Sequence, residues 1–169
     1  MAKASKTFQH IIHSIQPVYD ENSSILILGT LPSVKSREEN FFYAHPQNRF
    51  WKVLASIYGE NLPIYIEEKM QFLHKNRIAV WDTIFSCDII ASSDSSIKNV
   101  EPTNILPIIE NSKIERIFCN GKTAFNYYEK YHKKVLNMPA TLLPSTSPAN
   151  ASISLEELTN IWANAIKAN

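Results

Sequence analysis

The feature of this sequence that most constrains its fold is an alternation of short apolar runs with amphipathic stretches. Four apolar runs have the length of buried strands: residues 24–29, 77–82, 114–120 and 140–144. Between them, apolar side chains recur at helical spacing, as Phe50, Leu54 and Ile57 do within residues 47–58. Strands that alternate with helices form parallel sheets covered on both faces. The pattern therefore predicts an α/β fold, a three-layer α/β/α sandwich around a central, mostly parallel four-stranded sheet.

The helical stretches can be placed between these strands. Helices are expected over residues 6–15, 47–58, 64–74, 103–111 and 121–133, with a last one starting after Ser154. Ser154 followed three residues later by Glu157 is typical of a capping box, and Thr103 (or Glu101) is a candidate cap for the 103–111 helix. No linker or repeat divides the 169 residues, so we expect one domain over residues 1–169, enough to bury roughly 70% of the unfolded surface.

Composition excludes several classes of protein. A formal net charge of +1 argues against a histone-like binder, although a local basic groove could still bind nucleic acid. Cys87 and Cys119 are too few for an iron–sulfur cluster or a cysteine-rich zinc site, so we expect no metal and no cofactor. No secretory signal and no run near the ~20 apolar residues of a membrane span is present. The sequence thus indicates a cytoplasmic protein with no membrane association.

The carboxyl ends of parallel strands share one edge of a sheet, where open α/β folds bind ligands. The loops after the first, second and fourth strands should therefore meet. The first of these loops begins Gly29-Thr30-Leu31-Pro32-Ser33, in which glycine allows close approach of the backbone and proline stiffens the exit. A lone glycine excludes the G-x-G-x-x-G dinucleotide fingerprint, and a simple strand-to-loop turn is the alternative interpretation.

An aromatic, amide-bearing segment follows, Phe42 to Trp51. Tyr43 offers a flat ring on which a base could stack, and Asn48 offers both an amide donor and a carbonyl acceptor. Capping of the 47–58 helix is the alternative role for Asn48. His45 could assist as an electrophile or be structural. Phe50 and Trp51 are expected in the core.

The loop after the fourth strand reads Ser145-Thr146-Ser147-Pro148-Ala149. Its hydroxyl and backbone N–H groups could hold phosphates, and Pro148 with Ala149 could form an apolar wedge in the gap left by an extruded base. A plain Ser/Pro loop before a capped helix remains the alternative. Two weaker candidates are Lys122, at a helix start where a phosphate could bind, and Asp82, which could orient water or sugar or be structural.

These stretches, in this order, resemble the motifs of the uracil-DNA glycosylase superfamily over about residues 22–165. The chain looks most like the hypoxanthine-DNA (deoxyinosine) glycosylase family, and its 43–51 segment is also similar to mismatch-specific uracil/thymine glycosylases. Leu31 stands where the superfamily often has an Asp or Asn that positions water, and the 144–147 motif lacks the histidine of other branches. The resemblance implies that Asn48 takes over the catalytic role.

The resemblance further implies a set of site residues. It assigns catalysis to Asn48, base binding to Gly29, Thr30, Leu31, Tyr43 and His45, and DNA binding to Ser33, Lys122, Ser145, Thr146, Ser147, Pro148 and Ala149.

The expected activity is that of a monomeric, monofunctional DNA glycosylase that flips and releases deaminated bases, hypoxanthine first and then uracil or xanthine. Its partner would be DNA containing such bases. Three alternatives stay open: a glycosylase specific for uracil or mismatches, a non-catalytic binder of damaged DNA favoured by Leu31, and a flavodoxin-like small-molecule domain.

Overall fold

The computed structural model describes residues 7–168, and its centre is a four-stranded sheet. The strands are β2 (Ile25–Gly29), β3 (Ile78–Asp82), β6 (Arg116–Asn120) and β7 (Ala140–Leu143). They lie in the order β3-β2-β6-β7, and every neighbouring pair is parallel. The expected α/β sandwich, with all four strands near their predicted positions, is confirmed.

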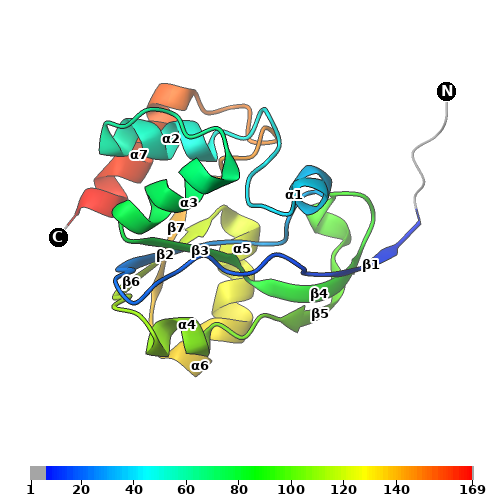
Figure 1. Cartoon of the computed structure of the whole chain (residues 1–169). Helices are drawn as coiled ribbons and strands as arrows, with labels where there is room; N and C mark the ends of the chain where they lie inside the picture. Colours follow the sequence, from blue (N-terminus) through cyan, green and yellow to red (C-terminus); the bar gives the residue numbers. More distant parts are fainter. Residues whose placement is uncertain (1–6, 169) are drawn as a thin grey trace, which may run out of the picture.

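Helices cover both faces of this sheet (Figure 1). On one face pack α2 (Phe50–Tyr58), α3 (Ile66–Lys75) and α7 (Leu155–Lys167). On the other pack α4 (Leu106–Glu110), α5 (Lys122–Tyr127) and α6 (Lys133–Leu136). Side chains of the central strand β2 alternate between the two layers, because successive residues of a strand point to opposite faces.

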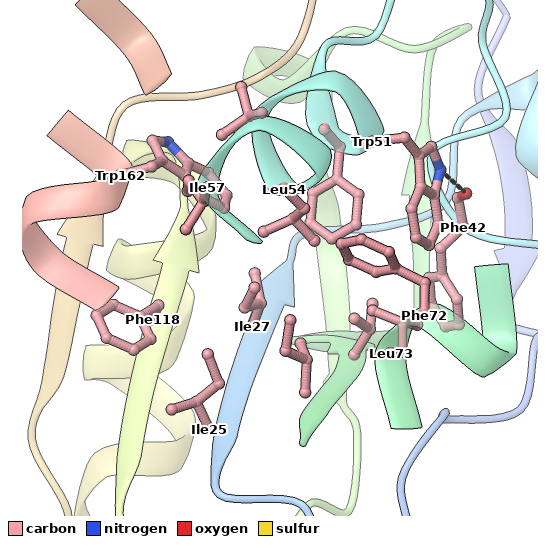
Figure 2. Packing of buried hydrophobic residues seen from close by; sticks show 14 of the residues in the cluster. Ile25, Ile27, Phe42, Trp51, Leu54, Ile57, Phe72, Leu73, Phe118 and Trp162 are labelled. Carbon is pink, nitrogen blue, oxygen red and sulfur yellow. Dashed lines mark hydrogen bonds between the residues drawn. The ribbon is translucent and has the colours of Figure 1, made fainter. Parts of the chain in front are cut away.

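The larger core lies under α2 and α7 (Figure 2). Ile25 and Ile27 of β2 face Leu54 and Ile57 of α2, with Trp162 of α7 alongside. Phe50 and Trp51 are buried, as the sequence predicted, and the Trp51 indole N–H donates to the carbonyl of Phe42 at 3.3 Å. This bond and the packing hold the 42–51 segment firmly against the sheet.

A second, antiparallel sheet was not predicted. It consists of β1 (Gln9–Ile12), β4 (Ile84–Ile89) and β5 (Lys98–Pro102), in the order β1-β4-β5. The expected helix at residues 6–15 is therefore wrong over its described part, since Gln9 to Ile12 pair with β4; Lys6 lies outside the described residues. Pairing with a distant strand overrode the local helical pattern.

Helix boundaries also differ from the sequence pattern. A short helix, α1 (Val34–Glu39), follows the first loop and was not predicted. α4 is shorter than residues 103–111, with Ile105 as its N-cap. Thr103 does not cap it and instead donates its hydroxyl to the carbonyl of Asp82 at 2.7 Å. The expected 121–133 helix contains a π-helical turn, η2 (Tyr128–His132), between α5 and α6. Ser154 caps α7 as predicted, accepting from the Glu157 N–H at 3.1 Å.

A short 3₁₀ turn, η1 (Asp94–Ser96), joins β4 to β5 at the rim of the site described below. In the described part of the chain, no helix has the length and apolar character needed to cross a membrane.

Candidate active site

A cleft of about 590 Å³ opens at the carboxyl ends of the parallel strands. Its walls come from residues 29–33 after β2, from the 42–48 segment, and from residues 145–149 after β7. Asp82 at the end of β3 and Asn120 at the end of β6 contribute to it. The rest of the rim comes from Ile89 at the end of β4, from residues 91–94 after it, and from Ser36 and Arg37 of α1. The loops after β2, β3 and β7 thus meet, as the parallel arrangement predicted.

Asn48 lies on this cleft with its side-chain carbonyl already engaged. Its Oδ1 accepts the backbone N–H of Phe50 at 3.0 Å and the hydroxyl of Thr146 at 2.8 Å. The N-cap residue of α2 is Arg49, so Asn48 lies one residue before the cap and binds the first N–H of the helix, while its role in catalysis stays a prediction. With both lone pairs of Oδ1 in use, the amino group Nδ2 is what Asn48 can offer to a ligand.

Thr146 is itself held by Asn120. The Asn120 Oδ1 accepts the backbone N–H of Thr146 at 3.0 Å, and the Asn120 Nδ2 donates to the Thr146 hydroxyl at 2.9 Å. Thr146 has no exposed surface, so its hydroxyl serves this network and does not face DNA. The structure thus does not support the expected DNA contact from that side chain.

A buried pair lies at the floor of the cleft. His13 Nε2 donates to Asp82 Oδ2 at 2.7 Å, while His13 Nδ1 accepts the backbone N–H of Ile15 at 3.2 Å. Because Nδ1 is an acceptor there, the His13 ring carries its proton on Nε2 and donates it to the Asp82 carboxyl group. The other carboxylate oxygen, Oδ1, lies against Gly29, where a side chain would collide with it.

Tyr43 reaches the same floor. Its ring stacks on Phe50 with centroids 3.9 Å apart, and its backbone has a positive φ of 52°, uncommon for tyrosine. The hydroxyl is buried and, within residues 7–168, has no hydrogen-bond partner. Burial raises the pKa of the Tyr43 phenol far above its usual value, and the charge of Asp82 adds to this, while the nearby Asn120 amide opposes it. Tyr43 is therefore a neutral O–H with one ring face already covered.

The other residues predicted to bind the base also line the cleft, and they differ in exposure and in what they contact. Gly29 is buried, whereas Thr30 and Leu31 are partly exposed. Leu31 packs against the apolar cluster of the second sheet, which accounts for an apolar residue at this position. His45 is exposed, and its Nδ1 accepts the backbone N–H of Gln47 at 3.1 Å.

The DNA-binding candidates other than Ser33 belong to the loop after β7 and to the start of α5. Pro148 and Ala149 are exposed at the tip of the 145–149 loop, while the Ser145 and Ser147 hydroxyls accept backbone N–H groups of that loop. Lys122 is exposed in a shallow hollow that shares Ser145, Ser147 and Ala149 with the cleft. Ser33 lies on the opposite side and caps α1 by accepting the Ser36 N–H at 3.2 Å.

Sequence reasoning missed two arginines at the site. Arg49 donates to the carbonyls of Ile153 at 2.6 Å and Asn150 at 2.9 Å, so it fastens the loop after β7 to the Asn48 segment. Arg37 lines the cleft with a buried guanidinium nitrogen that has no partner among the described residues. Only the tertiary structure reveals these roles, because no local pattern specifies the partners of either side chain.

The comparison with protein-family models matches residues 16–165 to the model described as the uracil DNA glycosylase superfamily. The chain belongs to this superfamily. The matched range includes every segment that lines the cleft, those with Asn48, Asp82 and Tyr43 among them.

Two relatives and one solved structure align with this chain over most of its length. The hypoxanthine DNA glycosylase of Methanosarcina barkeri (strain Fusaro / DSM 804) is 34% identical over 154 residues, 89% of this chain and 95% of the relative. The protein of the same name from Methanosarcina acetivorans is 35% identical over 139 residues, 81% and 87% of the two chains. The solution NMR structure of a candidate uracil DNA glycosylase from Methanosarcina acetivorans aligns with this chain with a TM-score of 0.76 and 31% identity. The alignment covers 94% of this chain and 98% of that one.

Proposed function

We propose that this superfamily member is a monofunctional DNA glycosylase that hydrolyses the N-glycosidic bond of deaminated bases, with hypoxanthine as its main substrate. The observation that carries the proposal is the cleft itself, with an amide donor at Asn48 above a floor of Asp82 and Tyr43. The relatives' activity, named as hypoxanthine DNA glycosylase, agrees with it. A base must leave the duplex to enter such a cleft.

The floor of the cleft fits the edge of a deaminated base. Deamination turns the acceptor N1 of adenine into an N1–H donor and its amino group into a carbonyl, and cytosine changes in the same way at N3. The charged Asp82 Oδ1 would accept this new N–H, and the unpartnered Tyr43 hydroxyl would meet the new carbonyl. Adenine and cytosine present the opposite pattern, which leaves buried groups unpaired and costs about 1–3 kcal/mol for each.

Asn48 would act on the leaving base. Cleavage of the glycosidic bond places positive charge on the sugar and negative charge on the base, and water then adds at C1′ to give the free base and an abasic site. A neutral amide is too weak a base to deprotonate water, and its oxygen is occupied. The Nδ2–H group would instead donate to the base as charge develops there, in a geometry fixed before reaction.

The partner in this proposal is DNA that contains a deaminated base, bound between the 145–149 loop and the opposite rim. The protein acts as a monomer in this proposal, since it has to enclose a single nucleotide. Its compartment is the cytoplasm. Its cysteines, Cys87 and Cys119, are both buried and free, which suits a reducing compartment. The molar mass from light scattering, measured with and without a short duplex, tests whether the protein is a monomer.

The test is base release from labelled duplexes that each contain one deoxyinosine, deoxyuridine, deoxyxanthosine or G·T mismatch, without added metal, followed by alkali to reveal abasic sites. We expect release from deoxyinosine to be fastest. Faster release from deoxyuridine or G·T would transfer the assignment to a uracil- or mismatch-specific glycosylase. Tight binding of all duplexes with no release would show that the protein is a non-catalytic binder.

A further inference from the structure

We propose that Thr146 is a positioning residue that, together with Asn120, fixes which end of the Asn48 amide faces the substrate. The inference rests on the proposed role of Asn48. It gives Thr146, which sequence reasoning placed at the DNA, a different task. Its basis is a chain of hydrogen bonds in which every donor and acceptor is determined.

The direction of the chain is set first at Asn120. A backbone N–H can only donate, so the N–H of Thr146 identifies the atom 3.0 Å away as the Asn120 oxygen. The other end of that amide, Nδ2, must then donate to the Thr146 hydroxyl at 2.9 Å. The hydroxyl proton is left to bond to Asn48 Oδ1 at 2.8 Å.

The same direction follows independently from the Asn48 end. The backbone N–H of Phe50, at the start of α2, lies 3.0 Å from Oδ1 of Asn48 and requires an acceptor there. A flipped Asn48 would place its amino group against this N–H and against the Thr146 hydroxyl. Two separate backbone N–H groups, of Thr146 and Phe50, thus agree on one orientation.

Burial makes this orientation costly to lose. Thr146 is fully buried, and Asn120 is 9% exposed, so water cannot readily replace either partner. The backbone adds a link, because the carbonyl of Thr146 accepts the N–H of Arg49, the residue after Asn48, at 3.0 Å. The loop after β7 and the loop carrying Asn48 are therefore joined by one backbone and one side-chain hydrogen bond at Thr146.

The experiment compares Thr146→Val, which keeps the shape and removes the hydroxyl, with Thr146→Ser, which keeps the hydroxyl. Single-turnover base release from a deoxyinosine duplex, duplex Kd and Tm are measured for each. We expect Thr146→Val to slow release by about 10- to 100-fold, the effect of a misplaced reacting group, with Kd changed less than about threefold. Thr146→Ser should stay within about threefold of the parent rate. Thr141→Val, on the exposed part of β7, is the matched control.

Two further measurements separate positioning from general stability. In an Asn48→Ala background, Thr146→Val should slow release by no more than about twofold, because the group it positions is gone. The Asn48 side-chain amide resonances in a ¹⁵N spectrum should shift in Thr146→Val and not in Thr141→Val. A parent-like rate for Thr146→Val, or equal slowing in both backgrounds, would overturn the inference. Absence of release by the parent protein defeats the proposed function instead, and the amide resonances still report on the orientation.

Discussion

Gly29 and Asp82 are packed so closely that a single added methyl group at Gly29 would collide with the carboxylate. An ideal Cβ on Gly29 would overlap Oδ1 of Asp82 and would lie 3.0 Å from the Tyr43 hydroxyl. The residues end neighbouring strands and lie opposite each other in the β2–β3 register. Gly29 is thus required by the floor of the cleft, and its φ is not in the left-handed region.

Gly29→Ala tests this relationship. The methyl group should rotate the Asp82 carboxylate and break its bond to His13, because the paired backbone of β2 and β3 cannot readily yield. We expect base release to fall by about tenfold or more and stability by about 1–3 kcal/mol, as for other overpacked sites. Urea unfolding and single-turnover release measure the two effects. Parent-like release by the Gly29→Ala protein would show that Asp82 does not need its observed position.

Asp82→Asn tests whether Asp82 reads the base. His13 Nε2–H would hold the new amide oxygen, so an amino group would replace the acceptor that faces Gly29. Release of hypoxanthine should fall by about 100-fold, since a donor would meet N1–H. Release of purine from a deoxynebularine duplex should fall far less, because its N1 is an acceptor. Equal losses on both substrates would argue against base reading by Asp82.

Asn48→Asp separates donation from water activation. The new carboxylate keeps an acceptor for the Phe50 N–H and the Thr146 hydroxyl, but replaces the Nδ2 donor with an oxygen. We expect a loss of about 100-fold in release, similar to that of Asn48→Ala. Asn48→Ala should also lose about 1 kcal/mol of stability with its bond to the Phe50 N–H at the start of α2, whereas Asn48→Asp should not. An Asn48→Asp enzyme as fast as the parent would favour water activation at this position.

Arg49→Lys tests the link between the two loops. Lysine keeps the charge but cannot reach the carbonyls of Ile153 and Asn150 as a fork. Amide hydrogen exchange over residues 145–153 should accelerate, and duplex affinity should fall by about three- to tenfold. Lys52→Arg, at an exposed position of α2, is the control and should change neither quantity. Unchanged exchange in Arg49→Lys would mean that packing alone holds the loop.

Stability should depend on pH through His132. Its Nε2 donates to the carbonyl of Thr83 at 2.8 Å, and burial lowers its pKa below the ordinary value, while that hydrogen bond opposes the shift. The unfolded state then binds the proton more readily, so this contribution is complete above about pH 6.5 and is lost as pH falls through the lowered folded-state pKa. Urea unfolding from pH 5 to pH 8 should show a flatter slope for His132→Gln.

The parallel sheet could be predicted from the sequence because its strands are short, apolar and separated by helical patterns. The second sheet could not, since β1 is mostly exposed and gains its strand form only by pairing with β4, far along the chain (Gln9 with Ile89). The same limit applies to Thr103. Threonine is a residue type that often caps helices, but here its hydroxyl donates to the carbonyl of Asp82. Local pattern reports local preference, and long-range pairing can override it.

The sequence by itself determined the α/β class, the order of the strands' loops and the residues Tyr43 and Asn48 as site candidates, because these follow from periodicity and motif order. Only the tertiary structure decided how those residues are used. In it His13 donates a hydrogen bond to Asp82, and Thr146 forms hydrogen bonds with Asn48 and Asn120. Leu31 packs against the second sheet. The physical reason is that hydrogen-bond direction and burial depend on partners distant in sequence, which no local pattern specifies.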